Sequence, residues 1–427
     1  MSSARGAAYR ASRVLARASR APPLGGMFGR VTCGAIAGER RRVSTAALHP
    51  SSYLADDAPV PTSTRAIAYD AHGHAPRVLR LRELPLPPLG PSDVLVRFLA
   101  SPVNPADVNT VEGTYPLRPD VFPAVGGHEG VGVVVRAGAN VDARAFRAGP
   151  GDPTPALVVP DRPGLGTWRE WAVIASRDVR KVAPGVPIET AAQLTVNPPT
   201  AYRMLTDYVT LRPGAHAVIL NAATSAVSRA AIQMCASRRV DVVALLRARD
   251  DWDADADALR ALGATLVLPD DAAAIRTPDA RKAIAALPPL VLGLDGVGGA
   301  SSANVASALA RDGALITYGG MARTPVWVPT GAAIFKNIRS EGFWLTRWTA
   351  EAKAAEEKAV EATREEGGAP AKTTESPRER MFRRLEKMAA EGELRMPATR
   401  VTMEGFVDAL ENTPRVGATK KVLWMDA

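Results

Sequence analysis

The sequence predicts an α/β fold in which a doubly wound parallel sheet follows a mainly β lobe. Residues 216–221 (His-Ala-Val-Ile-Leu-Asn) form a short apolar run, as expected of a strand buried on both faces of a parallel sheet. Residues 226–237 then carry apolar side chains at helical intervals of three and four, and a second apolar run follows at 240–246. Strand, helix and strand make one βαβ unit. Residues 64–100, in contrast, alternate around Pro/Gly-rich turns in the manner of β-strands.

The first 50 residues differ in charge from the rest of the chain. They hold nine arginines and one acid, a net charge of +8, which leaves +1 of the chain's total of +9 for all the remaining residues. The basicity therefore indicates an organellar address signal and not nucleic-acid binding, because an Arg-, Ser- and Ala-rich leader that lacks acids is typical of transit peptides. We expect a mitochondrial transit peptide at 1–50, cleaved between Arg42 and Thr62, with a plastid leader as the alternative.

Cysteine and apolar content exclude two classes of protein. The chain of 427 residues has two cysteines, Cys33 in the expected leader and Cys235 in the 226–237 helix, so neither a disulfide framework nor a cysteine-rich zinc site is available. No apolar run approaches the roughly 20 residues that a membrane-spanning helix needs.

The mainly β lobe is expected over residues 62–200. Strands are predicted at 65–69, 78–81 and 94–98. The glycines of 123–134 (Pro-Ala-Val-Gly-Gly-His-Glu-Gly-Val-Gly-Val-Val) suit tight turns in a compact, barrel-like lobe.

The turn at 222–225 is the candidate phosphate site, since the helix that follows it offers backbone N–H groups and a positive dipole end. Ala222, Ala226 and Ser228 stand where a dinucleotide fingerprint has glycines. The Cβ and hydroxyl of Ser228 either crowd the helix against the strand, which would weaken cofactor binding, or add a polar group there.

Two arginines end the second strand, where an acid would contact the ribose 2′-OH of NAD. Arg247 and Arg249 favour a 2′-phosphate there, and therefore NADPH. The alternative is that both are exposed charges that balance the aspartates at 250, 251 and 253.

A Rossmann-type domain is expected over residues 201–340, and residues 341–427 should return to the β lobe. The expected elements of this half are a helix that ends at Gly263, strands at 265–268, 291–295 and 314–318, a glycine-rich turn at 296–299, a helix at 302–310, a helix at 381–391 and a strand at 421–425. A low-complexity insertion is expected at about 350–380.

Gly127-His128-Glu129, followed by Gly130 and Gly132, resembles the signature of the medium-chain dehydrogenase/reductase superfamily, whose zinc-dependent alcohol dehydrogenases bind zinc through that histidine and two cysteines. The cysteines are missing here, and Asn104 stands about where the first would be. A Cys/His/Cys zinc site therefore cannot form. His128 is expected to be structural, and no metal site is expected.

Within the zinc-free branch, the chain most resembles the mitochondrial trans-2-enoyl-thioester (enoyl-CoA) reductases of fatty acid synthesis. The matching blocks stand in the family's order at 102–109, 113–116, 123–127, 164–168, 196–205, 317–321, 334–337 and 342–345. The resemblance implies a GroES-like catalytic domain, a Rossmann domain for NADPH, and reduction of 2-enoyl thioesters carried on CoA or acyl carrier protein. It also implies a homodimer.

The resemblance assigns Tyr115 the catalytic role of proton donor to Cα of the substrate. A phenol suits this task, because at its ordinary pKa of about 10 it stays protonated at neutral pH. The alternative for Tyr115 is a half-buried turn residue. The resemblance also implies a set of cofactor-binding residues: Asn197, Thr224, Ser225, Ala226, Val227, Arg247, Arg249, Tyr318, Gly319, Gly320, Met321, Phe343, Trp344, Leu345, Thr346 and Lys420.

Several alternatives stay open. Trp344 competes with plain core packing and Lys420 with a solvated surface lysine. The whole chain competes with a zinc-free NADPH quinone or enone reductase, and with a catalytically silent relative that acts as a binding protein.

Overall fold

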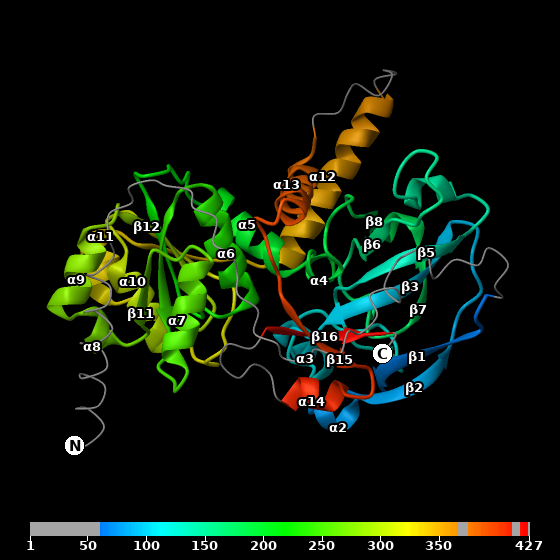
Figure 1. The fold of residues 1–427 in the computed structure, drawn as a ribbon, viewed down its shortest axis with the longest axis horizontal. Helices are drawn as coiled ribbons and strands as arrows, with labels where there is room; N and C mark the ends of the chain where they lie inside the picture. Colours follow the sequence, from blue (N-terminus) through cyan, green and yellow to red (C-terminus); the bar gives the residue numbers. More distant parts are fainter. Residues whose placement is uncertain (1–59, 366–374, 412–418, 426–427) are drawn as a thin grey trace, which may run out of the picture.

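The computed structural model describes residues 60–365, 375–411 and 419–425, in two lobes joined side by side (Figure 1). The expected transit peptide and part of the expected insertion lie outside these residues. No helix in the described ranges is long and apolar enough to cross a membrane.

The first lobe is built on two sheets. A seven-stranded sheet runs in the order β15-β16-β3-β5-β6-β8, with β7 paired to β3, and a three-stranded sheet runs β2-β1-β4. The strands of the first lobe are β1 (Ser63–Tyr69), β2 (Arg80–Pro85), β3 (Asp93–Pro102), β4 (Ala124–Val125), β5 (Val131–Ala137), β6 (Leu157–Pro160), β7 (Trp171–Ala175), β8 (Val179–Lys181), β15 (Ala398–Thr402) and β16 (Lys420–Trp424).

The last strand returns the C-terminal segment to the first lobe. β16 pairs antiparallel with β3, with Leu423 opposite Ser101, and parallel with β15. This is the return that the sequence predicts for its final apolar run.

One predicted strand of this lobe is wrong in its bounds. The strand expected at 78–81 begins only at Arg80, because Ala75–Val78 is the short helix α2, with proline in its first turn. Proline is compatible with the first turn of a helix, where its missing N–H would have no partner.

The second lobe is a six-stranded parallel sheet in the order β11-β10-β9-β12-β13-β14. Its strands are β9 (Ala217–Leu220), β10 (Asp241–Leu246), β11 (Leu266–Pro269), β12 (Leu290–Asp295), β13 (Ala314–Thr317) and β14 (Arg339–Gly342). Numbered in chain order, the strands stand 3-2-1-4-5-6, the doubly wound order. The first three strands are added toward one edge of the sheet and the last three toward the other, so the order reverses between the first and fourth strands. Ligands of such sheets bind at the carboxyl ends beside that reversal, here β9 and β12.

Helices cover both faces of the parallel sheet because its strands are apolar on both sides. Ile219 and Val243 pack with the helices of one face, whereas Val218 and Val242 pack with those of the other. The helices of this half are α5 (Asn197–Asp207), α6 (Ala226–Ser237), α7 (Trp252–Ala261), α8 (Ala272–Ile275), α9 (Pro278–Ala285), α10 (Gly299–Ala308) and α11 (Thr330–Lys336).

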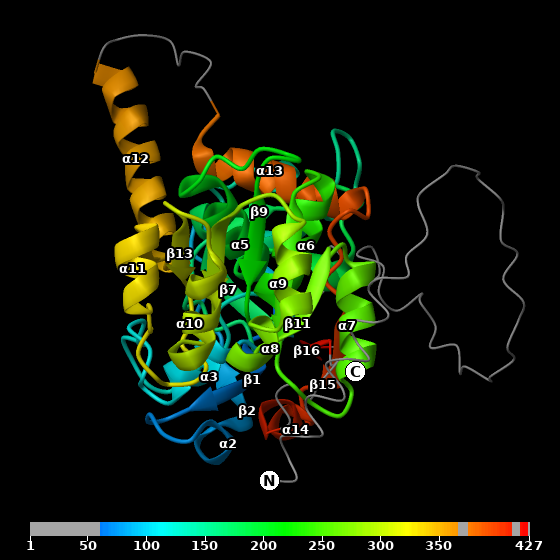
Figure 2. The same cartoon turned by 90° about the vertical axis from the view of Figure 1, so that its left-hand side faces the viewer.

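Two later helices, α12 (Leu345–Glu365) and α13 (Pro377–Ala390), stand beside the junction of the lobes, and α12 projects beyond both (Figures 1 and 2). Arg378 of α13 forms an ion pair with Asp161 of the first lobe at 2.6 Å. It also forms one with Glu356 of α12 at 2.9 Å, which joins the two helices to each other. Among the described residues, the remaining α-helices are all short: α3 (Pro105–Val111), α4 (Ile188–Ala191) and α14 (Phe406–Glu411).

Candidate active site

Tyr115 lies in the loop after α3 and meets the segment that leaves the parallel sheet. A capping box between Asn104 and Asp107 begins α3, and the backbone N–H of Tyr115 donates to the carbonyl of Asn109 at 3.2 Å. Its hydroxyl accepts a hydrogen bond from Nε1 of Trp344 at 2.8 Å. Thr346 is hydrogen-bonded to the same hydroxyl. The fold therefore brings together three predicted site residues from different lobes.

The surroundings of Tyr115 keep its phenol protonated. Burial raises the pKa of Tyr115, the hydrogen bonds of Trp344 and Thr346 lower it, and the charge of Asp107 raises it, with a net increase. Because the pKa starts at 10.0 and rises, the side chain carries its proton at neutral pH. A neutral hydroxyl that is fixed in direction can donate a proton to a developing carbanion.

His128 is the titratable neighbour of the Tyr115 ring. The two ring centroids are 6.1 Å apart. Nε2 of His128 is 2.9 Å from the hydroxyl of Thr110 and 3.8 Å from Oδ1 of Asp107. The backbone N–H of His128 donates to the same Asp107 oxygen at 2.9 Å. The loop before β5 is thus tied to α3 by a buried carboxylate.

A buried polar network adjoins Tyr115 and His128, and only Asn197 and Lys420 of this network are among the predicted site residues. Nδ2 of Asn104 donates to Glu129 at 2.8 Å, and Nδ2 of Asn197 donates to Oδ1 of Asn104 at 3.1 Å. Nζ of Lys420 donates to the same Asn104 oxygen at 2.8 Å. Burial raises the pKa of Glu129 to about 7.

The network shows which of the two alternatives for Lys420 holds, and it contains two acids that the sequence does not predict as site residues. Lys420 is not a solvated surface lysine, because its ammonium is buried among Asn104, Glu129 and Asp107, and burial lowers its pKa. Asp107 and Glu129 were not predicted as site residues. For Glu129 the sequence offers one signal, an acid among glycines that border an apolar strand, since buried acids need partners.

The turn after β9 is closed by hydroxyl groups. Ser225 caps α6 by accepting from the backbone N–H of Ser228 at 3.2 Å. The hydroxyl of Ser228 donates to the carbonyl of Asn221 at 3.0 Å. The Tyr318 hydroxyl lies 3.5 Å from Ser225 Oγ and 3.4 Å from Ser228 Oγ. Of the two alternatives for Ser228, the structure shows the added polar group, because its hydroxyl links the helix to the strand end.

The other turn residues surround the reversal point of the sheet. Thr224 is half-buried in the turn, and Ala226 and Val227 begin α6. The carboxylate of Asp295, at the end of β12, accepts from Asn221 Nδ2 at 2.6 Å and from the N–H of Gly298 at 3.0 Å. The carboxyl ends of β9 and β12 are therefore held together where a doubly wound sheet binds its ligand.

Arg247 and Arg249 follow β10 directly, with Arg247 exposed and Arg249 half-buried. Nε of Arg249 is buried without a hydrogen-bond partner in the described part of the chain. Burial lowers the pKa of Arg249, the charge of Arg247 lowers it further, and Asp255 raises it. The acid whose charge raises the pKa of Arg249 is thus Asp255.

The remaining predicted residues divide between surface and core. Gly319, Gly320 and Met321 follow β13, and the Met321 side chain is 63% exposed. Phe343 is buried and packs edge-on against Tyr208, with ring centroids 6.4 Å apart. Leu345 begins α12 and packs on the main core. Trp344 is not a plain core residue, because its indole N–H serves Tyr115.

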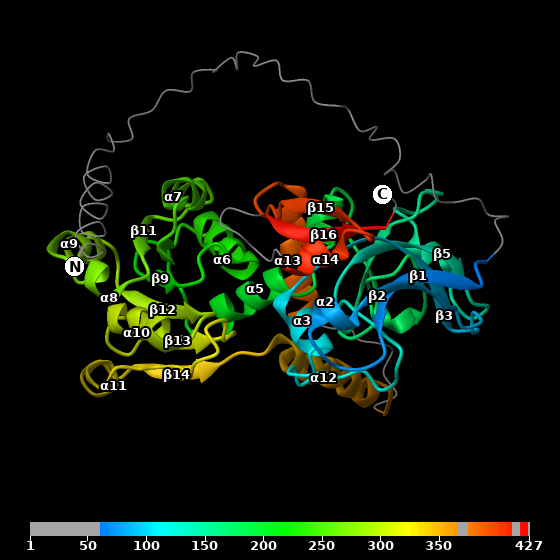
Figure 3. The same ribbon diagram turned by 90° about the horizontal axis from the view of Figure 1, so that it is seen from below.

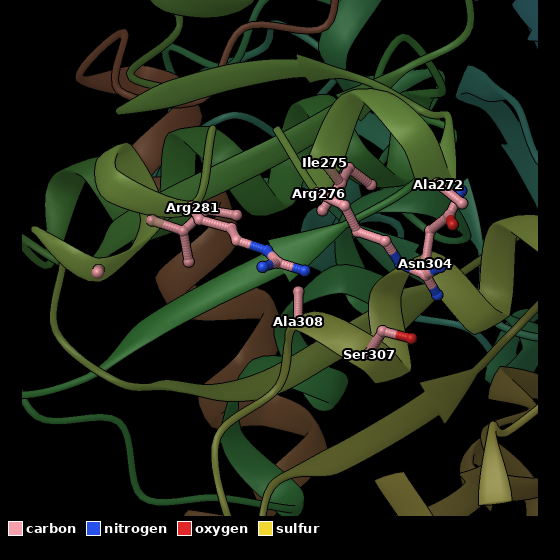
Figure 4. Close-up of a pocket in the computed structure, with 9 residues that line it drawn as sticks. Ala272, Ile275, Arg276, Arg281, Asn304, Ser307 and Ala308 are labelled. Carbon is pink, nitrogen blue, oxygen red and sulfur yellow. The ribbon is translucent and has the colours of Figure 1, made fainter. Parts of the chain in front are cut away.

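One cavity lies away from these residues, among helices α8, α9 and α10 (Figure 4). Its volume is about 290 Å³, and Arg276 and Arg281 reach into it beside Asn304. No residue of the candidate site lines it. Among the residues that the structure describes, no group of three or more His, Cys, Asp and Glu side chains could hold a metal ion.

The β lobe, the parallel sheet and the site at their junction are those of the medium-chain dehydrogenase/reductase class. Residues 90–183 match the alcohol dehydrogenase GroES-like domain. The mitochondrial enoyl-[acyl-carrier-protein] reductase of Mus musculus is 41% identical over 288 residues, which are 67% of this chain and 74% of that protein. The chain belongs to the family of mitochondrial enoyl-[acyl-carrier-protein] reductases.

Solved structures agree with this family. The complex of Etr1p with NADP and crotonyl-CoA is 28% identical, with a TM-score of 0.70, and the match covers 85% of this chain and 100% of that one. The heterodimer of the mitochondrial 2-enoyl thioester reductases Etr1p and Etr2p from Candida tropicalis is 27% identical, with the same TM-score of 0.70 and coverage of 85% and 100%.

Proposed function

We propose that this enzyme reduces the carbon–carbon double bond of trans-2-enoyl thioesters, with NADPH as the reductant. The observation that carries the proposal is the Tyr115 hydroxyl, which is protonated and oriented by Trp344 at 2.8 Å. A fixed neutral phenol matches a reduction that needs one proton at carbon. The solved relative that binds NADP and crotonyl-CoA supports the same substrate and cofactor classes.

The residues around the turn after β9 fit a phosphorylated dinucleotide. Ser225 begins helix α6, and the backbone N–H groups of Thr224–Val227 would hold the pyrophosphate at the helix N-terminus. The unpartnered Nε of Arg249, with Arg247 beside it, would hold the 2′-phosphate. Lys420, from β16 of the first lobe, and Asn197, at the start of α5, would face the nicotinamide end. When bound, NADPH supplies a hydride for Cβ of the substrate.

The protein's own part in the reaction is to bind, orient and protonate. Trp344 and Thr346 fix the direction of the Tyr115 hydroxyl. Tyr115 transfers its proton to Cα, so that the O–H bond breaks as the C–H bond forms, and the charge on the thioester carbonyl is neutralised. The buried network of Asn104, Glu129 and Lys420 keeps this side of the site rigid.

A comparison of two substrates tests the function. The purified enzyme is given NADPH with 2-hexenoyl-CoA or with a benzoquinone, and NADPH consumption is followed by its absorbance. The proposal predicts a kcat/KM for the enoyl thioester at least about 100-fold above that for the quinone. A larger value for the quinone would establish the quinone reductase, and no NADPH binding in a titration would establish the silent binding protein.

We also propose a homodimer formed through the edge of the parallel sheet. β14 lies at the edge of the sheet and pairs only with β13 among the described strands (Figure 3). Its residues are all exposed. Beside it, α11 exposes Ile334 (66%) and Phe335 (72%). An unpaired edge next to large apolar side chains is a surface that a second copy can cover. The heterodimer of the related reductases supports this assembly.

The location and the division of the chain are proposals as well. We propose that the protein works in mitochondria, supported by the charge of residues 1–50 and by relatives that are named mitochondrial. We further propose that residues 62–200 and the C-terminal return form the catalytic domain, and that residues 201–340 form the cofactor domain. The substrate's carrier is CoA or acyl carrier protein.

A further inference from the structure

His128 has a buried ring nitrogen to which no described residue is hydrogen-bonded. The side chain is 8% exposed, and its Nδ1 has no hydrogen-bond partner among the described residues. The other ring nitrogen, Nε2, contacts Thr110 at 2.9 Å and faces Asp107 at 3.8 Å. A buried polar atom without a partner costs free energy unless it serves a water or a function.

The proposed reaction leaves Tyr115 in need of a proton. Once its O–H bond has broken, the side chain is a phenolate in a partly buried position, where burial and the charge of Asp107 both disfavour the anion. The next turnover cannot begin until the phenol is restored. A proton source close to the ring would therefore determine how fast the enzyme recovers.

We propose that His128 returns the proton to Tyr115 after each turnover, through one bridging water between Nδ1 and the phenolate oxygen. This inference rests on the proposed function. The Nδ1–H bond of the imidazolium breaks, the O–H bond of Tyr115 forms, and neutral His128 then takes a proton from solvent. A water is needed because no direct hydrogen bond joins the two side chains among the described residues, and their ring centroids are 6.1 Å apart. His128 acts through Tyr115 and is a positioning residue.

The groups around His128 suit a donor that gains and loses a proton. From α3, Asp107 stabilises the imidazolium and Thr110 fixes the ring. Burial raises the pKa of Asp107, whereas the charges of His128 and Lys420 lower it, so these three groups interact electrostatically beside Tyr115. The other titratable groups on this side are Glu129, next in sequence, and Lys420 of β16, which interacts with Asp107.

Stopped-flow kinetics separates proton return from the chemical step. His128→Asn and His128→Gln are mixed with saturating NADPH and 2-hexenoyl-CoA. Tyr115 starts each experiment protonated, so the first turnover should stay within about twofold of the wild-type rate, and later turnovers should slow about tenfold or more. The trace would then show a burst of one NADPH per site, and added imidazole should restore the later rate. His216→Asn, at a half-buried histidine of the second lobe, should show no burst.

Equal slowing of the first and later turnovers, or no slowing of either, would overturn the role of His128. Should neither variant bind NADPH, the solvent isotope effect on the wild-type enzyme decides. A larger slowing of the later turnovers than of the first in D2O supports proton return. Equal slowing of both contradicts it. A wild-type enzyme that does not oxidise NADPH with 2-hexenoyl-CoA defeats the proposed function itself, which is a different result.

Discussion

The hydrogen bond from Trp344 to Tyr115 joins side chains 229 positions apart, one from each lobe. Tyr115→Phe removes the hydroxyl and leaves the ring in place. We expect turnover to fall roughly 100-fold or more, because protonation of Cα loses its donor, while the Kd for NADPH changes little. Steady-state kinetics and a fluorescence titration measure the two quantities.

The matched control is Tyr69→Phe, at a buried tyrosine in the core of the first lobe. It makes the same chemical change away from the site, and its turnover should stay within about twofold of the wild-type value. If Tyr115→Phe turns over as fast as this control, the phenol has no part in the reaction.

The buried Glu129 should make stability depend on pH. Burial raises its pKa from 4.5 to about 7, so the folded protein holds a proton that the unfolded chain releases above about pH 4.5. The stabilisation by this group is complete below that pH and is lost as the pH rises through 7. In Glu129→Gln, the fall of the free energy of unfolding across this window should be smaller. Denaturant unfolding at a series of pH values measures it.

Glu357→Gln is the control, at an exposed glutamate of α12. Its pH dependence should follow that of the wild-type protein. A Glu129→Gln protein with the full wild-type pH dependence would show that other groups carry it.

The residue-scale site could be predicted from the sequence only in part. Tyr115 and Lys420 were identified through resemblance, because neither stands in a pattern that local spacing makes distinctive. Asp107 and Glu129 were missed because their burial depends on contacts between α3, the loop before β5 and β16, which lie far apart in the chain.

At the scale of elements, the contact between β9 and α6 depends on Ser228. Its hydroxyl donates to the carbonyl of Asn221, so the serine takes part in the helix–strand contact that a glycine would form by close approach. Ser228→Ala should lower the free energy of unfolding by about 1 kcal/mol and should not tighten NADPH binding. Thermal unfolding and a titration test this. Tighter binding with unchanged stability would mean that the hydroxyl only crowds the turn.

The end of β10 should determine which nicotinamide cofactor is preferred. Arg247→Ala together with Arg249→Ala removes both guanidinium groups. The ratio of kcat/KM for NADPH to that for NADH should fall about 10-fold or more, because the KM for NADPH rises. Arg260→Ala, at an exposed position of helix α7 in the same lobe, is the control. If the double variant keeps the wild-type preference for NADPH, the two arginines do not bind the cofactor and are surface charges.

Elements were predicted well where their patterns are local. The helix expected at 226–237 has those bounds, and the apolar strands of the parallel sheet lie within one or two residues of their expected positions. β14 was not predicted, because Arg-Ser-Glu-Gly has neither alternation nor an apolar run. It is a strand because β13 offers it a free edge.

At the scale of the whole molecule, the sheet edge and helix α11 should hold two copies together. Phe335→Glu places a charge in the proposed interface, where desolvation opposes burial, and should weaken the dimer roughly tenfold or more. Sedimentation velocity over a range of concentrations measures this. Val360→Glu, at an exposed apolar residue of α12, should leave the assembly unchanged. A wild-type protein that sediments as a monomer throughout would contradict the proposed dimer.

The most direct test of the central claim traces each hydrogen of the product. The enzyme reduces 2-hexenoyl-CoA in D2O with unlabelled NADPH, and then in H2O with NADPH deuterated at C4 of the nicotinamide. NMR of the hexanoyl product should show solvent deuterium at C2 alone and cofactor deuterium at C3 alone. Solvent deuterium at C3, or cofactor deuterium at C2, would contradict a mechanism in which the cofactor reduces Cβ and Tyr115 protonates Cα.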